Sequence, residues 1–168
     1  MLARLHRAFE RVLEWVVIVL LLLLALEVVL GVVYRYLGNP IAWYDEIASV
    51  LLAWVTYYGA ALAALKRAHI GVPGFIAALS ARPRLAAVLF GEACVLTFFA
   101  LLAWYGGRVL QLLSGDTLAT VDLPVLVTQS VIPLGALLFI AAELLILPET
   151  LRDGRRHRRT AAADGVDL

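Results

Sequence analysis

The chain has 168 residues and a formal net charge of +1 at pH 7, and 63% of its residues are hydrophobic. A typical soluble domain is about half apolar, and the mean hydropathy of this chain lies far above that of such a domain. This composition excludes a soluble catalytic domain and predicts an all-α protein embedded in a bilayer.

Four stretches contain the roughly 20 mostly apolar residues that a helix needs to cross about 30 Å of hydrocarbon. We predict one four-helix transmembrane domain over residues 1–150, with spans at residues 12–33, 44–65, 85–107 and 125–147. The basic and then Ala-rich residues 151–168 predict a disordered tail.

The first apolar stretch follows Arg4, Arg7 and Arg11, an arrangement that also occurs in secretory signal peptides. It is too long for the apolar region of a signal peptide, it contains Glu27, and no small-residue cleavage motif closes it. We therefore interpret it as a retained helix. Glu27 and Gly31 share one face of this helix, and that face is expected to look toward protein.

The basic residues are distributed very unevenly between the two sides of the predicted spans. Of the 14 Lys and Arg residues, all but Arg35 and Arg108 lie on one side: Arg4, Arg7, Arg11, Lys66, Arg67, Arg82, Arg84, Arg152, Arg155, Arg156, Arg158 and Arg159. By the positive-inside rule, both termini are predicted to be cytoplasmic. The run at residues 155–159 resembles a nucleic-acid patch in composition, but topogenic charge beside anionic lipid explains it better, and no nucleic-acid partner is expected.

The second predicted span is bracketed by acids at its outer end and by cations at its inner end. Small and weakly polar residues recur along it at spacings near three, four or seven: Asp45, Ser49, Thr56, Gly59 and Ala63. Such a stripe lets helix backbones approach closely. Trp43 and Tyr44 lie at the depth of a membrane interface, whereas Tyr57 and Tyr58 lie deeper and are expected to contribute to packing.

Two of the connections carry further predictions. Between the second and third spans, apolar residues recur at helical spacing from Val72 to Leu79, which predicts a short interfacial helix. The polar loop at residues 108–124 is the natural surface for a partner arriving from outside. Beyond it, Pro133 lacks an N–H group and should kink the fourth helix unless neighbours compensate.

Carboxylates within the spans are the main candidates for chemistry. Glu27, Glu92 and Glu143 lie inside predicted spans, where an ionised carboxylate costs about 2.5 to 3.5 kcal/mol on insertion scales. One hypothesis is a proton or ion relay through Glu27. The alternative is that these groups are protonated, bonded to neighbouring helices, or reach toward the membrane surface. The spans supply too few converging polar groups for a coupling site.

Other chemistries are excluded by residue counts. The single Cys94 cannot form an intramolecular disulfide, and His6, His69 and His157 lie at or beyond the cytoplasmic ends of the spans, which leaves no axial ligands for haem. No metal cluster, phosphate loop or nucleophile elbow is present. No cofactor is therefore expected, and His69 is better explained as a contact at a helix C-terminus.

Several residues together resemble a known pattern. They are Arg35, Tyr36, Gly38, Pro40, Trp43, Glu46, Trp54, Gly59, Ala60, Ala61, Arg67, His69, Ile70 and Val72, with Leu123, Pro124, Ile132, Pro133, Leu134 and Gly135 further on. This set is similar to the small membrane subunit (DctQ type) of tripartite ATP-independent periplasmic (TRAP) transporters, and the likeness covers nearly the whole chain.

The resemblance implies a transporter component of the bacterial inner membrane and not an enzyme. In this family a periplasmic binding protein captures a small carboxylate solute, a large membrane subunit holds the substrate and sodium sites, and the small subunit packs against the large one as a scaffold. The implied structural or subunit-interface residues are Arg35, Trp43, Asp45, Glu46, Trp54, Gly59, Arg67, His69 and Glu27. Among these, Trp43 and Glu46 are expected to contact the large subunit or to anchor the second helix at the outer interface.

A second hypothesis is an autonomous four-helix exporter that couples to protons through Glu27. Proteins of that type are usually shorter, with tight loops, and some have a weak charge bias. This chain has a strong bias and long connections, which favours the subunit. A free-standing membrane scaffold cannot be separated from the subunit hypothesis by sequence alone.

Overall fold

The computed structural model describes residues 2–66 and 81–146, and it places these residues almost entirely in helices. The helices are α1 (Leu2–Tyr36), α2 (Tyr44–Leu65), α4 (Ala81–Leu112) and the short α5 (Val125–Thr128), followed by a helix over residues 131–146. Four of the described segments are long and apolar enough to cross a membrane: His6–Tyr36, Tyr44–Leu65, Ala86–Leu112 and Val125–Ile146. The all-α, four-span prediction is confirmed.

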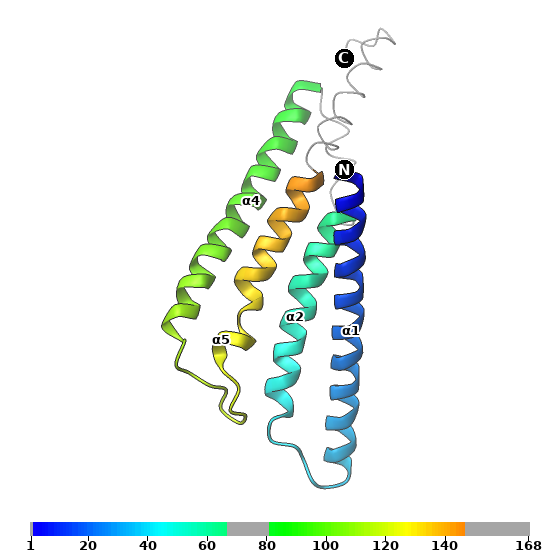
Figure 1. Cartoon of the computed structure of the whole chain (residues 1–168), viewed down its shortest axis with the longest axis vertical. Helices are drawn as coiled ribbons and strands as arrows, with labels where there is room; N and C mark the ends of the chain where they lie inside the picture. The colour runs from blue at the N-terminus through cyan, green and yellow to red at the C-terminus, as the bar shows by residue number, and fades with distance from the viewer. Residues whose placement is uncertain (1, 67–80, 147–168) are drawn as a thin grey trace.

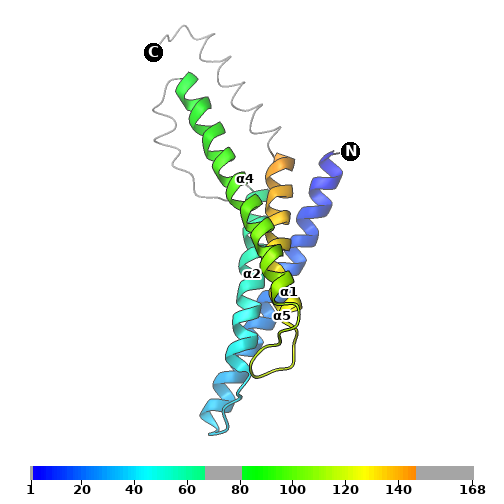
Figure 2. The same ribbon diagram turned by 90° about the vertical axis from the view of Figure 1, so that its left-hand side faces the viewer.

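The described helices lie side by side and form a layer. Figure 1 shows them in the order α4, the 131–146 helix, α2 and α1. In the turned view of Figure 2 they lie largely behind one another, so they do not enclose a central bundle core. The start of α1 and the end of the 131–146 helix lie at the same end of the molecule (Figure 1).

The helix bounds differ from the predicted spans mainly at the ends. The second span was predicted at residues 44–65 and α2 runs from Tyr44 to Leu65. In contrast, α1 and α4 each extend beyond the predicted spans at both ends. Hydropathy locates the part of a helix that fits in hydrocarbon, whereas a helix can continue into the polar interface. The interfacial helix predicted between the second and third spans falls on residues 67–80, outside the described part of the chain.

The best-packed region joins α1, α2 and the 131–146 helix. It is a cluster of buried residues: Leu13, Ala61, Ala64, Leu65, Phe139, Ala142 and Ile146. Alanines on facing helices let the backbones approach closely. Further along the contact between α2 and the 131–146 helix, a Cβ atom on Gly135 would lie 2.6 Å from the Cβ of Tyr57, so only glycine fits there.

The pair α1 and α2 is joined by a tight outer turn. Gly38 has a φ of 76°, the left-handed conformation that commonly ends a helix and that glycine adopts without strain. Gly31 is buried, and the ring of Tyr44 lies directly where its side chain would be. The predicted inward face of α1 at Gly31 is therefore confirmed, with Tyr44 as the contact.

The fourth span is interrupted one turn before its proline. α5 ends at Thr128 and the next helix starts at residue 131. The ring of Pro133 cannot coexist with an ordinary helical carbonyl four residues earlier, and the N–H of Ile132 bonds to the carbonyl of Gln129, at 3.1 Å, in a tighter turn. Pro133 thus lies in the first turn of the new helix, where its missing N–H costs little.

Candidate functional site

The N-terminal end of α2 is tied to the loop that connects α4 and α5. One carboxylate oxygen of Glu46 accepts the backbone N–H of Ala119 at 3.0 Å. The other accepts both the backbone N–H of Thr120, at 2.9 Å, and its hydroxyl. Hydrogen bonds to a charged acceptor are roughly twice as strong as neutral ones, and the first turn of a helix favours negative charge. Glu46 thus links segments 74 residues apart in the sequence.

The loop at residues 113–124, called here the outer loop after the side on which the positive-inside rule predicts it, is also ordered by its own backbone. The N–H of Leu118 bonds to the carbonyl of Leu123 at 3.0 Å, and the N–H of Val125 bonds to the carbonyl of Asp116 at 2.9 Å. These bonds close the loop into a compact hairpin-like shape. Glu46 therefore binds a loop that is already folded back on itself.

Trp54 forms a second tie between α2 and the fourth span. Its indole N–H donates to the carbonyl of Thr128 at 2.9 Å. In an unbroken helix that carbonyl would accept from Ile132, whose N–H instead turns to Gln129. Trp54 thus supplies the donor that the interrupted helix loses, which is the compensation that a proline in a membrane helix requires.

The predicted small and weakly polar stripe of α2 is mostly exposed within the described chain: Asp45, Ser49 and Thr56 are exposed, and Gly59 and Ala63 are half-buried. These five residues, together with the exposed Leu52 on the same face, are called here the open face of α2. The hydroxyls of Ser49 and Thr56 donate to backbone carbonyls within α2, at 2.8 Å each. A Cβ atom on Gly59 would meet nothing within 4 Å. The two hydroxyls of the open face are therefore satisfied within α2, and Gly59 leaves room on that face for a neighbouring helix.

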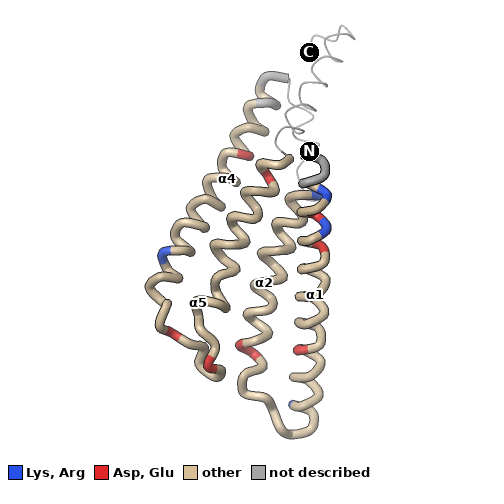
Figure 3. Tube along the Cα trace, viewed as in Figure 1, with Lys and Arg blue, Asp and Glu red and all other residues tan. Residues whose placement is uncertain are grey.

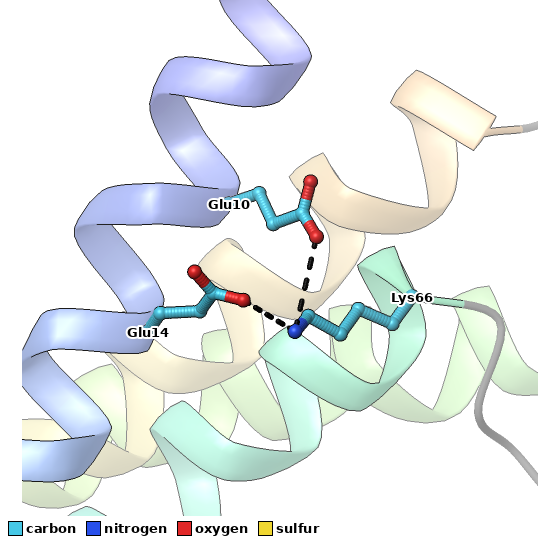
Figure 4. A network of polar contacts seen from close by, with 3 residues as sticks. All are labelled: Glu10, Glu14 and Lys66. Carbon is cyan, nitrogen blue, oxygen red and sulfur yellow. Dashed lines mark hydrogen bonds and ion pairs between the residues drawn. The ribbon is translucent and has the colours of Figure 1, made fainter.

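The C-terminal end of α2 is tied to α1 by charge. Figure 4 shows the ammonium of Lys66 between two carboxylates of α1, Glu14 and Glu10. Lys66 donates a hydrogen bond to Glu14, and its nitrogen lies 3.9 Å from Glu10. The hydrogen bond to Glu14 and the charges of both acids raise the pKa of Lys66, so its ammonium stays charged at physiological pH.

The structure shows no contact role for the other predicted residues that it describes. Arg35 is exposed in the last turn of α1, and Trp43 precedes α2 with 39% of its surface exposed. Arg67 and His69 lie outside the described residues.

Of the three carboxylates within the spans, Glu92 and Glu143 lie near enough for their charges to interact. Figure 3 shows that charged residues gather near the two ends of the described helices. Glu27, Glu92 and Glu143 are half-buried on three different helices. Within residues 2–66 and 81–146, no three His, Cys, Asp or Glu side chains come together as metal ligands. The described spans thus hold no assembled polar site of the kind a transport path needs.

Comparison with known proteins identifies the family. The sequence model described as tripartite ATP-independent periplasmic transporters, DctQ component, matches residues 24–153. The chain belongs to this family. DctQ proteins are transporter subunits, so the chain is a membrane transport component and not an enzyme.

A DctQ relative is known by name. The C4-dicarboxylate TRAP transporter small permease protein DctQ of Rhodobacter capsulatus is 27% identical over 133 residues. The match covers 77% of this chain and 59% of the relative, so the chain spans about three fifths of the length of the relative it matches.

The sequence alone predicted only part of the contacts that Glu46, Trp54 and Lys66 make in this DctQ chain. Glu46 was expected to contact the large subunit or to anchor the second helix, and Trp54 was a candidate without an assigned contact. Their partners within the chain, Thr120 and Thr128, were not candidates. Lys66 was counted only as a topogenic charge, although the spacing of Glu10 and Glu14, one helical turn apart, was a signal for a shared cation.

Proposed function

We propose that this chain is the small scaffold subunit of a sodium-coupled TRAP transporter in the bacterial inner membrane. Its complex imports a small carboxylate solute, with C4-dicarboxylates as the class suggested by the R. capsulatus relative. A large membrane subunit carries the transport path, and a periplasmic binding protein delivers the solute. Family membership supports this assignment, and so does the lack of an assembled polar site within the described spans.

The single observation that carries the scaffold role is the open face of α2. If this face contacted only lipid, small and hydroxyl-bearing residues would give the helix no more stability than leucines at the same positions. Facing another helix, the same stripe permits close backbone approach and van der Waals packing, which drive association in membranes. Gly59, with no atom within 4 Å of its missing Cβ, is the position where a second helix fits most closely.

The large subunit is therefore assigned to the open face of α2, with Asp45 and Trp43 at its outer edge. The carboxylate of Glu46 already accepts hydrogen bonds from Ala119 and Thr120. The contact with the large subunit is therefore expected at the neighbouring residues Asp45 and Trp43. Arg35, in the last turn of α1, serves as a structural or interface residue, and the same role is proposed for Arg67 and His69.

Both termini of the chain are proposed to be cytoplasmic, on the basis of the positive-inside rule. Single cysteines at Asp116 and at Arg155 in a Cys94→Ser background test this orientation. An impermeant thiol reagent added to intact cells should label the cysteine at position 116 and not that at position 155. The reverse labelling would show the opposite orientation.

The experiment that tests the function is purification of the tagged chain in mild detergent. A large membrane protein should copurify at a fixed ratio. Liposomes containing that complex should take up a C4-dicarboxylate only with both the binding protein and an inward sodium gradient. Should the chain purify alone and transport alone, the subunit assignment is wrong.

A further inference from the structure

The carboxylate of Glu46 is fully used by the outer loop. Its two oxygens accept three donors, two from consecutive backbone N–H groups at Ala119 and Thr120 and one from the Thr120 hydroxyl. Consecutive backbone N–H groups that converge on one point form an anion-binding concavity. The loop thus presents a built anion site, and the chain fills it with its own side chain.

The loop that Glu46 holds carries exposed polar side chains. Asp116, Thr117 and Asp122 are all exposed on it. Its own backbone bonds fix its internal shape. The hydrogen bonds from Ala119 and Thr120 to Glu46 add a contact between the loop and the first turn of α2.

We propose that Glu46 is a positioning residue, which holds the outer loop in the orientation that the loaded binding protein recognises. The proposal rests on the proposed function, because it takes the arriving partner to be that protein. Glu46 does not touch the solute. Its loss frees the loop, and the binding protein must then order the loop as it docks, which weakens docking without altering the later transport steps.

The first measurement follows the loop directly in the intact complex. Glu46→Gln removes the charge, and Glu46→Ala removes the acceptor entirely. Amide hydrogen exchange at Ala119 and Thr120 should accelerate about tenfold in Glu46→Ala, the effect of about 1.4 kcal/mol, and less in Glu46→Gln. Asp45→Asn, which removes the neighbouring charge in the same turn, should leave exchange at both amides unchanged. Equal exchange in wild type and Glu46→Ala would overturn the proposal.

The second measurement follows docking. In liposomes containing the complete complex, the concentration of loaded binding protein that gives half-maximal uptake should rise about tenfold in Glu46→Ala, with the maximal rate within about twofold. An unchanged half-maximal concentration despite faster exchange would overturn the docking role, as would a loss of maximal rate alone.

The loop side provides a matched pair in case Glu46 variants fail to assemble. Thr120→Val removes the hydroxyl donor at nearly constant shape, and Thr120→Ser retains it. Only Thr120→Val should raise the half-maximal concentration, and equal behaviour of the two would contradict the account. If liposomes with the wild-type complex take up solute without the binding protein, the proposed function is wrong. Hydrogen exchange at Ala119 and Thr120 would still show whether Glu46 holds the loop.

Discussion

The third and fourth spans have nearly equal mean hydropathy but opposite surroundings. Within the described chain, 39% of the most apolar stretch of Val125–Ile146 is buried, against 0% for Ala86–Leu112. The fourth span lies between α2 and α4, whereas α4 forms one edge of the layer (Figure 1). Hydropathy therefore reports which segments enter the bilayer and says nothing about which of them pack together.

Position in the layer and residue size both contribute to the difference. The fourth span places Gly135, Ala136 and Ala142 in buried positions, where short side chains bring backbones together. α4 instead presents Phe98 and Trp104 outward, with 59% and 68% of their surfaces exposed. Bulky apolar side chains suit lipid tails, and small ones suit neighbouring helices.

The largest effect is expected at the closest contact of the fourth span. Gly135→Ala places a methyl group 2.6 Å from the Cβ of Tyr57, which is backbone-proximal and cannot swing aside. Overpacking of this kind costs about 1 to 3 kcal/mol, measurable as a lower unfolding midpoint in detergent. Gly107→Ala on α4, where nothing lies within 4 Å, should keep or raise the midpoint. Equal losses at both positions would contradict the packing difference.

A smaller effect is expected where α4 meets the fourth span. The rings of Phe99 and Phe139 stack with centroids 3.7 Å apart and planes 10° apart. Phe99→Leu should lower stability by about 0.5 to 1.5 kcal/mol through loss of that pair, in the same unfolding assay. Phe90→Leu on the same helix, at a residue with 72% exposure, should have no measurable effect. If Phe90→Leu lowers stability as much as Phe99→Leu does, the stacked pair is not what holds α4 against the fourth span.

The charged tie at the inner end of α1 and α2 should contribute less. Lys66→Glu places three acids together and should lower the unfolding midpoint only slightly, because exposed ion pairs contribute little to stability. Exchanging the two charges, as Glu14→Lys with Lys66→Glu, should restore most of the loss. Because the pKa of Lys66 is raised, the contribution persists below its ordinary value of 10.5 and disappears only as pH rises above it. Failure of the exchanged pair to recover would show that the ion pair is not stabilising.

The smallest effect is expected at Glu27. It is half-buried on α1, apart from Glu92 and Glu143, so it lacks the converging groups of a relay. Glu27→Gln should leave complex assembly intact and solute uptake within about twofold of wild type, measured in liposomes. Complete loss of uptake by an assembled complex would instead support a relay through Glu27.

Much of the fold follows from the sequence because bilayer thickness imposes it. The bounds of α2 agree with the prediction since its apolar run ends abruptly at Lys66 and begins after a turn. The kink was expected from Pro133, but the break falls at residues 129–130, since the steric conflict of proline is with the preceding turn.

The ties between segments could not be predicted in the same way. Glu46 and Thr120 are far apart in the sequence, and no local pattern marks one as acceptor for the other. The stripe on α2 was visible in advance, but only the structure separates it from the faces of α2 that pack against α1 and the fourth span.

Photo-crosslinking from the open face of α2 tests the central claim most directly. Azidophenylalanine in place of Leu52, which lies on that face with 56% exposure, should form an adduct with the large membrane subunit in the intact complex. The same probe in place of Phe139, which is 4% exposed within the chain, should form none with another protein. Crosslinking from position 52 only to lipid, in a complex that remains assembled, would contradict the assignment of this face to the large subunit.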